Sequence, residues 1–401
     1  MFEVPPSYNE ADSYVYASIK PVLRVEAASL DECLHRILAE DVVSLKNTPP
    51  FNRATMDGYA IRAKDTVGAA TDSPKAFEII DYLYAGGVSK KYISENECIH
   101  ITTGAKIPDG ADSVVVAEKT GIENGRLCLY EPVNYGENIE AEGRDIKKGR
   151  VLLKQGAFLT PAKIGVVAAQ GISHLKIFEK PKIAIISNGE ELAEVGEILK
   201  DGQIYDVNSY IVGSIVKDNG CLPLKFGIVG DNPQQIKSVI EEALKVSDFV
   251  FISGGSSKGD KDYMSEILQK LGKVPAFKAK AANGKSGMLI IAEGKPVLGT
   301  PGFPSSCLIN ACVLLVPALR KMAQIPSIYN MSITAKMSEK IDFSKNITGR
   351  FLAVKIEGER AFPIENDNKG LANIAKADGY ILLNDETAVI EEGTAVSVNL
   401  F

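Results

Sequence analysis

The chain has few of the features that nucleic-acid-binding and membrane proteins share. Its 401 residues include 45 Lys and Arg against 51 Asp and Glu, and no basic run is long enough to contact a phosphate backbone. The longest apolar run, 308–319, is interrupted by an Asn and a Pro and is shorter than the roughly 20 residues that span a bilayer. These absences argue against nucleic acid as a partner and against a membrane span.

The sequence also lacks a secretory signal and a clustered set of metal-binding residues. Its amino terminus, MFEVPPSYNE, is polar and acidic, whereas a signal peptide is basic and then apolar. The six Cys lie far apart, no C-x-x-C pair occurs, and only three His are present. We therefore expect a cytoplasmic protein whose cysteines are reduced core thiols and not zinc ligands.

Length and composition indicate several ordinary globular domains. With 45% hydrophobic and 24% charged residues, the chain resembles an average globular protein, which excludes disordered and collagen-like classes. At roughly 150 residues per domain, this length corresponds to two to four domains.

The first part of the chain is predicted to contain helices on either side of a β-rich insert. Ser29 is a candidate N-cap, because apolar residues follow it at helical spacing, and residues 1 to about 45 are predicted to be helical. A second predicted helix begins at Pro161. Short β-type runs lie between them, separated by Gly, Pro, Asp and Asn. The pattern predicts a helical linker domain, 1–45 and 142–178, and an inserted β domain, 46–141.

Strands alternate with helices in the second part of the chain. From residue 181, strand-like and helix-like runs follow one another at 182–186, 208–220, 222–229, 231–246 and 248–253. This alternation predicts a doubly wound α/β domain with a parallel sheet over 179–326, and later β runs predict a C-terminal β domain over 327–401. Ligands bind at the carboxyl ends of parallel strands, so the candidate site comprises the loops after Ile186, Ile252 and Leu298.

The Gly-rich loop from Ser253 to Asp262 is suited to an anion. Its glycines allow backbone N–H groups to turn toward a phosphate. The loop has no Lys-Ser or Lys-Thr pair after its last glycine, which argues against an ATPase P-loop. An ordinary turn, with Asp262 as the first acid of a helix, is the alternative. The candidate phosphate contacts are Gly254, Gly255, Ser256 and Gly259.

Three acids are expected to meet at the same edge of the sheet. Glu191, Asp231 and Asp262 each follow a predicted strand, and carboxylates beside a phosphate suit a hydrated Mg²⁺. Solvated surface acids are the alternative. A third loop, 299–306, contains two Pro and a Gly that make it rigid, and a stiff helix entry is an equally fair interpretation of it.

Several long motifs resemble those of one family, in the same order. Residues 49–60, PPFNRATMDGYA, resemble P-x-F-x-x-S-A-M-D-G-Y-A, and residues 101–115, ITTGAKIPDGADSVV, resemble M-x-T-G-A-x-x-P-x-G-A-D-A-V-V. Further matches follow at 143–146, 187–192, 202–208, 253–262 and 299–305. The chain thereby resembles, over essentially its whole length, the molybdopterin molybdenumtransferases of the MoeA type, relatives of the gephyrin E domain.

The resemblance implies a fold, a reaction and partners. The fold is multidomain α/β plus β, with a central doubly wound α/β molybdopterin-binding domain, a helical linker domain, an inserted β domain and a small β-barrel-like C-terminal domain. Family members insert molybdenum from molybdate into adenylylated molybdopterin and release AMP. The resemblance further implies Mg²⁺, a homodimer with a composite active site and a MogA-like adenylyltransferase as a possible partner.

Site residues are carried over by motif position. The implied catalytic residues are Asp57, Thr103, Asp145, Glu191, Asp231 and Asp262, and the last three are the candidate metal ligands. The further substrate contacts are expected to be Pro301, Gly302, Pro304 and Ser305. Lys278 and Lys285 are candidates for contacts with a phosphate or oxyanion, and solvated surface lysines are the alternative.

The chain departs from the family pattern in two loops. Many members have K-P-G-K-P where this chain has Ala282-Asn283-Gly284-Lys285-Ser286, and a G-Q-G-S-type loop is replaced by residues 366–370, NDNKG. The loss of one Lys brings anion binding there into question. These departures are compatible with a tungstate-preferring paralogue or with a divergent lineage of the same enzyme. Independently of them, a non-catalytic pterin-binding scaffold of the same fold and a nucleotide-binding regulator are alternatives to the molybdenum-inserting enzyme.

Overall fold

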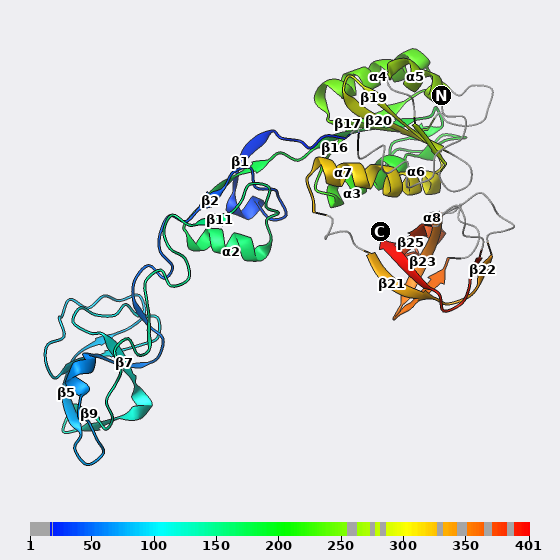
Figure 1. Ribbon diagram of the computed structural model, residues 1–401. Helices are drawn as coiled ribbons and strands as arrows, with labels where there is room; N and C mark the ends of the chain where they lie inside the picture. The colour runs from blue at the N-terminus through cyan, green and yellow to red at the C-terminus, as the bar shows by residue number, and fades with distance from the viewer. Residues whose placement is uncertain are drawn as a thin grey trace. The chain divides into compact units, whose positions relative to one another are not determined.

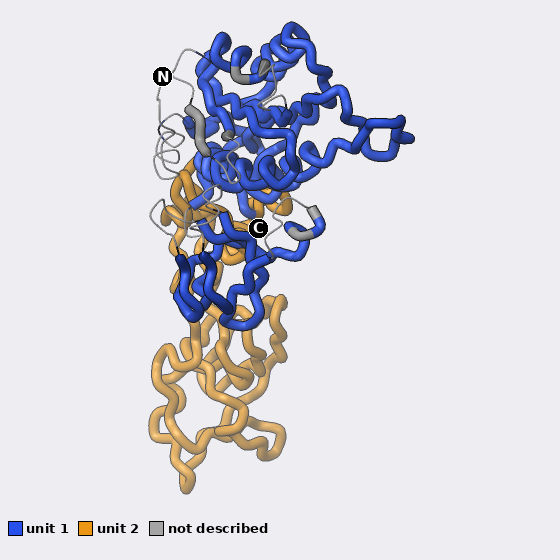
Figure 2. Tube along the Cα trace, turned by 90° about the vertical axis from the view of Figure 1, so that its right-hand side faces the viewer, with its two compact units in different colours: residues 1–27, 35–39, 176–401 blue, residues 28–34, 40–175 orange. Residues whose placement is uncertain are grey.

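In the computed structural model, the chain forms two compact units, each held together by its own internal contacts (Figure 2). Unit 1 comprises residues 1–27, 35–39 and 176–401, and unit 2 comprises residues 28–34 and 40–175. The structure describes residues 17, 19–254, 263–272, 277–280, 286–326, 332–342, 351–364, 371–382 and 389–401.

The described part of unit 1 contains a six-stranded sheet with strand order β16-β13-β17-β20-β19-β18 (Figure 1). Its strands are β13 (Lys182–Asn188), β16 (Leu222–Val229), β17 (Phe249–Ser253), β18 (Phe277–Lys280), β19 (Ser286–Ala292) and β20 (Lys295–Thr300). The first four strands in this order are parallel, whereas β19 and β18 are antiparallel to their neighbours. The prediction of a parallel sheet was wrong for this edge. Glu293 and Gly294, both at positive φ, form the tight turn that reverses the chain into β20.

Helices cover both faces of this sheet (Figure 1). Ile183 and Ile185 of β13 belong to a core cluster with residues of α3 (Asn208–Asp218) and of the helical segment α6 (Pro304–Asn310), η5 (Ala311–Leu315) and α7 (Val316–Met322). The alternate residues Ala184 and Ile186 belong to a second cluster with residues of α4 (Pro233–Val246) and α5 (Tyr263–Leu271). Because successive strand residues face opposite sides, both faces are buried, which confirms the doubly wound fold.

The segment Pro304–Met322 is long and apolar enough to cross a membrane, but 72% of its apolar window is buried inside the structure. It contributes Leu315 and Leu319 to the same core cluster as β13, which is typical of a core helix. Cys307 and Cys312 lie on it, and burial raises the pKa of both thiols to about 12. All six cysteines lie in the described part of the chain and are buried thiols, as predicted.

The carboxyl-terminal part of unit 1 is a small barrel. The described strands β21 (Ser332–Met337), β23 (Phe351–Glu357), β24 (Arg360–Pro363), β25 (Gly379–Leu382) and β27 (Ala395–Leu400) close it. Its interior includes Val354, Ala361 and Val398, each fully buried. The remaining elements there are β22 (Ile341–Asp342), β26 (Val389–Ile390) and α8 (Leu371–Ile374). This barrel confirms the predicted C-terminal β fold.

Unit 2, which is described throughout, is built on a six-stranded sheet with order β7-β4-β6-β5-β9-β8. These strands are β4 (Gly58–Ile61), β5 (Lys75–Leu83), β6 (Glu97–Ile101), β7 (Ser113–Val116), β8 (Thr120–Glu123) and β9 (Arg126–Leu129). The smaller elements are β2 (Val42–Val43), β3 (Arg53–Ala54), β10 (Ile139–Glu140), β11 (Val151–Leu153), α2 (Pro161–Ala169) and the 3-10 turns η2 (Ala63–Thr66) and η3 (Ala117–Lys119). The predicted β-rich insert is present.

The helix predicted after Ser29 was wrong. Ser29 ends β1 (Val25–Ser29), which pairs with β12 (His174–Phe178), and caps only the 3-10 turn η1 (Leu30–Glu32). His35 has a φ of 60°, which no α-helix tolerates. Beyond it, the carbonyl of Ile37 accepts a hydrogen bond from the N–H of Phe178 at 2.9 Å. Pairing with the returning chain thus takes the backbone groups that a helix would have used.

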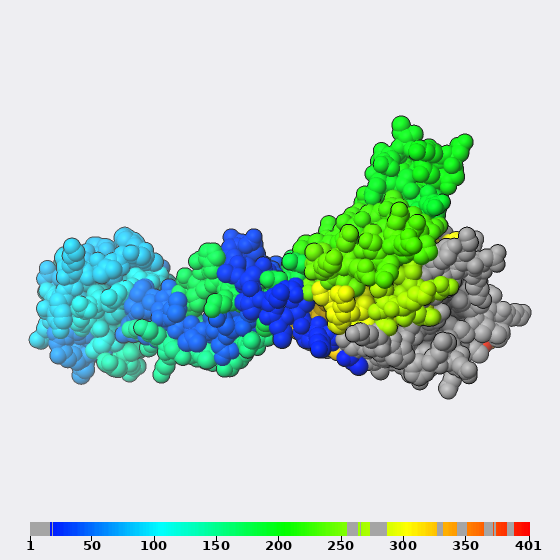
Figure 3. All heavy atoms as spheres, turned by 90° about the horizontal axis from the view of Figure 1, so that it is seen from above, coloured from blue at the N-terminus to red at the C-terminus, as the bar shows by residue number. Residues whose placement is uncertain are grey.

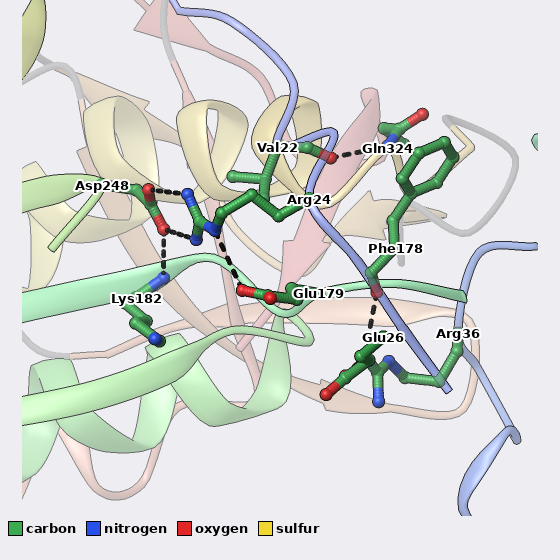
Figure 4. A network of polar contacts seen from close by, with 9 residues as sticks. All are labelled: Val22, Arg24, Glu26, Arg36, Phe178, Glu179, Lys182, Asp248 and Gln324. Carbon is green, nitrogen blue, oxygen red and sulfur yellow. Dashed lines mark hydrogen bonds and ion pairs between the residues drawn. The ribbon is translucent and has the colours of Figure 1, made fainter. Parts of the chain in front are cut away.

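One guanidinium ties the outgoing and returning segments of unit 1 together (Figure 4). Arg24 donates to both carboxylate oxygens of Asp248, at 2.7 and 2.8 Å, and to Glu179 at 2.9 Å. Asp248 also accepts from the N–H of Lys182, at the start of β13. Burial works to raise the pKa of Asp248, but the bonds from Arg24 and Lys182 lower it overall. The Asp248 carboxylate therefore links the chain before the insert to the amino-terminal ends of strands β13 and β17.

We expect Arg24→Gln to lower the free energy of unfolding by about 1–2 kcal/mol, because a charge-assisted bidentate bond is lost from a partly exposed pair. A lowered pKa means that Asp248 stabilises the fold above its unfolded pKa of about 4, and that this contribution is lost as pH falls further. The difference between the two proteins, measured by urea denaturation, should therefore shrink in acid. Lys355→Gln, which breaks an exposed pair with Glu357, should change little, and an equal loss in both variants would contradict the proposed role.

Candidate functional site

Asn188 holds two strand-end loops together at the carboxyl edge of the unit 1 sheet. It is the last residue of β13, and its side-chain Nδ2 donates to the carbonyl oxygens of Val229 and Gly230 at 3.0 and 3.1 Å. The N–H of Gly189 donates to Val229 as well. The loops that carry Glu191 and Asp231 consequently begin side by side, as predicted from the alternation of strands and helices.

Gly254, at the end of β17, brings a third loop against the same point. Its φ is +105°, and a Cβ built there would lie 2.0 Å from the carbonyl oxygen of Asn188. Its N–H donates to the carbonyl of Thr300, the last residue of β20, at 3.0 Å. A Cβ on Gly302 would lie 3.4 Å from the Cα of Gly254. The backbones of three loops approach so closely here that only glycine fits at position 254.

Buried polar groups that the sequence did not single out as site residues line this edge. Ser187 donates to Asp206 at 2.8 Å, and Asn208 donates to the carbonyl of Gly302 at 2.8 Å. Asn188 and Asn208 are only 3% and 8% exposed, yet within the described residues their Oδ1 atoms have no hydrogen-bond partner. The sequence signal for Asn208 was its place in the 202–208 motif, which the sequence analysis matched to the family without assigning this residue a functional role. Buried acceptors without donors indicate a ligand or ordered water.

Two of the three predicted metal ligands are described. Glu191 and Asp231 are exposed, and they follow the neighbouring strands β13 and β16. A Cβ on Gly189 would lie 2.5 Å from Oε2 of Glu191, so this carboxylate folds back over the end of β13. In the described ranges, no group of three or more His, Cys, Asp or Glu could hold a metal ion. Asp262 lies outside them, so the predicted three-acid set stays a prediction.

Of the residues predicted to contact the substrate, some are described by the structure and others are not. Pro301 and Gly302 lie in the loop between β20 and α6, whereas Pro304 and Ser305 are the first two residues of α6, and Ser305 is buried. Lys278 lies on β18, of which the backbone is described. Outside the described residues lie Gly255, Ser256, Gly259, Asp262 and Lys285.

Unit 2 brings the predicted pair Asp57 and Thr103 into direct contact. Oδ1 of Asp57 accepts from both the N–H and the Oγ1 of Thr103, at 2.7 and 2.8 Å. These two hydrogen bonds, the backbone one first, lower the pKa of Asp57, and the nearby His100 adds to the effect. Asp57 is therefore an exposed carboxylate that stays ionised. Asp145 is exposed too, and in the described chain no hydrogen bond or ion pair joins it to this pair.

Comparison with known proteins identifies the family. Three family models match the chain. The model of the "MoeA N-terminal region (domain I and II)" matches residues 6–171, and that of the "Probable molybdopterin binding domain" matches residues 184–321. The model of the "MoeA C-terminal region (domain IV)" matches residues 334–401. The chain belongs to the MoeA family. As a member, it is a transferase of molybdenum cofactor biosynthesis.

Individual relatives agree with this membership. The molybdopterin molybdenumtransferase of Staphylococcus epidermidis is 34% identical over 379 residues, which cover 93% of this chain and 90% of the relative. That of Bacillus subtilis is 33% identical over 387 residues, which cover 94% and 89%. A crystal structure of the MoeA protein from Pyrococcus horikoshii has a TM-score of 0.86 at 34% identity and covers 99% of both chains. The predicted MoeA-type fold is thereby confirmed.

In this MoeA-family chain, Gly254→Ala should destabilise unit 1 by more than the roughly 1–3 kcal/mol that a strained backbone alone costs, because the new Cβ must displace Asn188. Gly196→Ala is the matched control, since Gly196 has a φ of +103° but no atom lies within 4 Å of the point that its Cβ would occupy. Thermal unfolding of both variants measures the difference. Equal losses would show that the close approach to Asn188 does not matter.

Proposed function

We propose that this protein inserts molybdenum from molybdate into adenylylated molybdopterin and releases AMP. The observation that carries the proposal is the edge built around Asn188, where buried acceptor oxygens lie beside loops that carry two exposed acids. A phosphate that binds together with a hydrated cation needs carboxylates to hold the cation and acceptor oxygens for its water molecules. The described residues supply both kinds.

The oxygens at this edge fit Mg²⁺, which prefers carboxylates and keeps several waters. Glu191 and Asp231 would hold the ion, with Asp262 as the third predicted ligand, and the Oδ1 atoms of Asn188 and Asn208 would accept hydrogen bonds from its waters. When bound, the ion offsets the negative charge on the phosphate that leaves as AMP.

The anionic end of the substrate is assigned to the loops around the same edge. Gly254 is buried where the loops after β13, β17 and β20 meet, and Gly302 of the third loop packs against it. Backbone N–H groups in such loops bind phosphate oxygens. In this proposal Lys278 and Lys285 complement the charge of the phosphate or of the oxyanion.

With adenylylated molybdopterin as substrate, AMP release should require both molybdate and Mg²⁺, because the acids otherwise repel the anionic substrate. Asp231→Asn should lower the rate at least about tenfold, as loss of a metal-site group does. The green segment between Ala193 and Ile204 projects from the rest of unit 1 (Figure 3). Asp201 belongs to this stretch of the sequence and is exposed, and Asp201→Asn should leave the rate unchanged.

Chromatographic measurement of AMP decides the outcome. Undiminished release in excess EDTA, or an unaffected Asp231→Asn protein, would refute the cation role. A protein that binds the substrate but releases no AMP would be a pterin-binding scaffold. Faster release with tungstate than with molybdate would indicate a tungstate-preferring enzyme.

The active form is proposed to be a cytoplasmic homodimer, supplied with substrate by a MogA-like adenylyltransferase, with sites that combine Asp57 of one subunit with Glu191 of the other. In an isologous dimer the same surface of both subunits takes part in the interface, so every contact between the subunits occurs twice and two such sites form. Co-refolding Asp57→Ala with Glu191→Ala would give heterodimers with one intact site. As half of randomly paired dimers are heterodimers, activity should return to roughly a quarter of wild type. A mixture as inactive as its parents would place both acids in one chain.

A further inference from the structure

Unit 2 has a cluster of aromatic side chains that the register of its strands brings together. The sequence alone did not identify this cluster. Tyr59 of β4 and Tyr82 of β5 are both cross-strand partners of His100 in β6. The Tyr59 ring meets the His100 ring edge-on at 5.3 Å, and the Tyr82 ring lies 5.4 Å away at 37°. Tyr84 adds a fourth ring, 6.5 Å from His100.

This cluster is open to solvent on the side of two tyrosines. Tyr82 is 59% exposed and Tyr84 is 63% exposed, whereas Tyr59 packs against the buried core cluster of unit 2. Large aromatic rings are costly to leave in water, and adjacent exposed rings mark sites of contact. The core holds the Tyr59 ring, and the His100 ring lies between it and the exposed Tyr82 ring.

The cluster is fixed next to the Asp57–Thr103 pair. The N–H of Thr102 donates to the carbonyl of Leu83, and the hydroxyl of Thr102 accepts from the N–H of Ala85 at 3.0 Å. Because Tyr84 lies between Leu83 and Ala85, and Thr103 follows Thr102, these bonds hold the backbone at Tyr84 beside the backbone that carries Thr103. His100 also acts electrostatically on Asp57. An aromatic surface and an ionised carboxylate therefore adjoin.

We propose that Tyr82, Tyr84 and His100 form a stacking surface for the pterin ring of the substrate, with Asp57 accepting hydrogen bonds from the ring edge. The proposal rests on the proposed function, because it assigns one part of that substrate to unit 2. Stacking on aromatic side chains recognises a flat heterocycle, and the adjoining carboxylate selects which edge the heterocycle presents.

The chemistry of the carboxylate favours a pterin over an adenine. Oδ1 of Asp57 already accepts two hydrogen bonds from Thr103, which leaves the two lone pairs of Oδ2 as the remaining acceptors of the carboxylate. A pterin presents a ring N–H and an exocyclic amino group side by side, and both are donors. Adenine presents one amino donor beside a ring nitrogen that is an acceptor, and an ionised carboxylate repels that acceptor.

The test titrates the full-length protein with 6-hydroxymethylpterin and follows quenching of the pterin fluorescence. The chain contains no Trp, so protein emission does not interfere. Tyr82→Leu and Tyr84→Leu should each weaken binding roughly tenfold, the effect of losing one stacking partner. Tyr82→Phe keeps the ring and should bind as wild type. Tyr135→Leu, at an 83% exposed tyrosine of unit 2 outside the cluster, should also bind as wild type.

Several results would overturn the assignment. These are absence of saturable quenching by the wild-type protein, equal affinity of the Tyr82→Leu, Tyr84→Leu and wild-type proteins, and an equal loss in Tyr135→Leu. A parallel titration with AMP addresses the other ring: Tyr82-dependent binding of AMP in preference to the pterin would assign the surface to adenine and refute the proposal. Thermal melts of the variants establish that they are folded.

The proposed function is judged by a separate measurement. AMP release from adenylylated molybdopterin that persists in the Tyr82→Leu/Tyr84→Leu protein with unchanged KM would refute the stacking surface and leave the reaction intact. Conversely, a wild-type protein that binds the pterin through the tyrosines but releases no AMP would refute the reaction and leave the stacking surface intact.

Discussion

The close approach of Asn188 to Gly254 is the constraint on which the carboxyl edge of the sheet depends. The Asn188 side chain binds the backbone after β16, while its carbonyl oxygen leaves no room for a side chain at the end of β17. One residue thus holds the backbone of three adjacent strands at one place. Side chains on the following loops can be aimed at a ligand only because their starting points are fixed in this way.

The two units present different chemistry to a ligand. The edge around Asn188 offers amide oxygens, loop backbone and exposed acids, which suit phosphate and a hydrated cation. Unit 2 offers aromatic rings beside an ionised carboxylate, which suit a flat heterocycle. A molybdopterin nucleotide contains both kinds of group. The proposed division of the substrate between the units follows from this complementarity.

Arg24 performs a structural task that keeps unit 1 intact despite a long insertion. Arg24 lies just before the chain first leaves unit 1, after residue 27, and Glu179 lies just after its last return, at residue 176, whereas Asp248 directly precedes β17. The ions are partly buried, so the hydrogen bonds compensate the cost of removing them from water. These contacts thereby join residues of unit 1 that are far apart in sequence.

Hydrophobic patterning by itself determined the alternating strands and helices of unit 1 and the β-rich insert. Each such element buries one face, and the spacing of the apolar residues on that face can be read from the sequence. Order along the chain likewise placed Glu191 and Asp231 after neighbouring strands. Local pattern failed at Ser29, where pairing with the returning chain replaced a helix, and at β19, where a tight turn reversed the strand. Only the tertiary structure decided the contacts of Asn188 with Gly254 and of His100 with Tyr59, Tyr82 and Tyr84. Those contacts depend on the register of neighbouring strands and on close packing between segments far apart in the sequence, and no local sequence pattern specifies either of them.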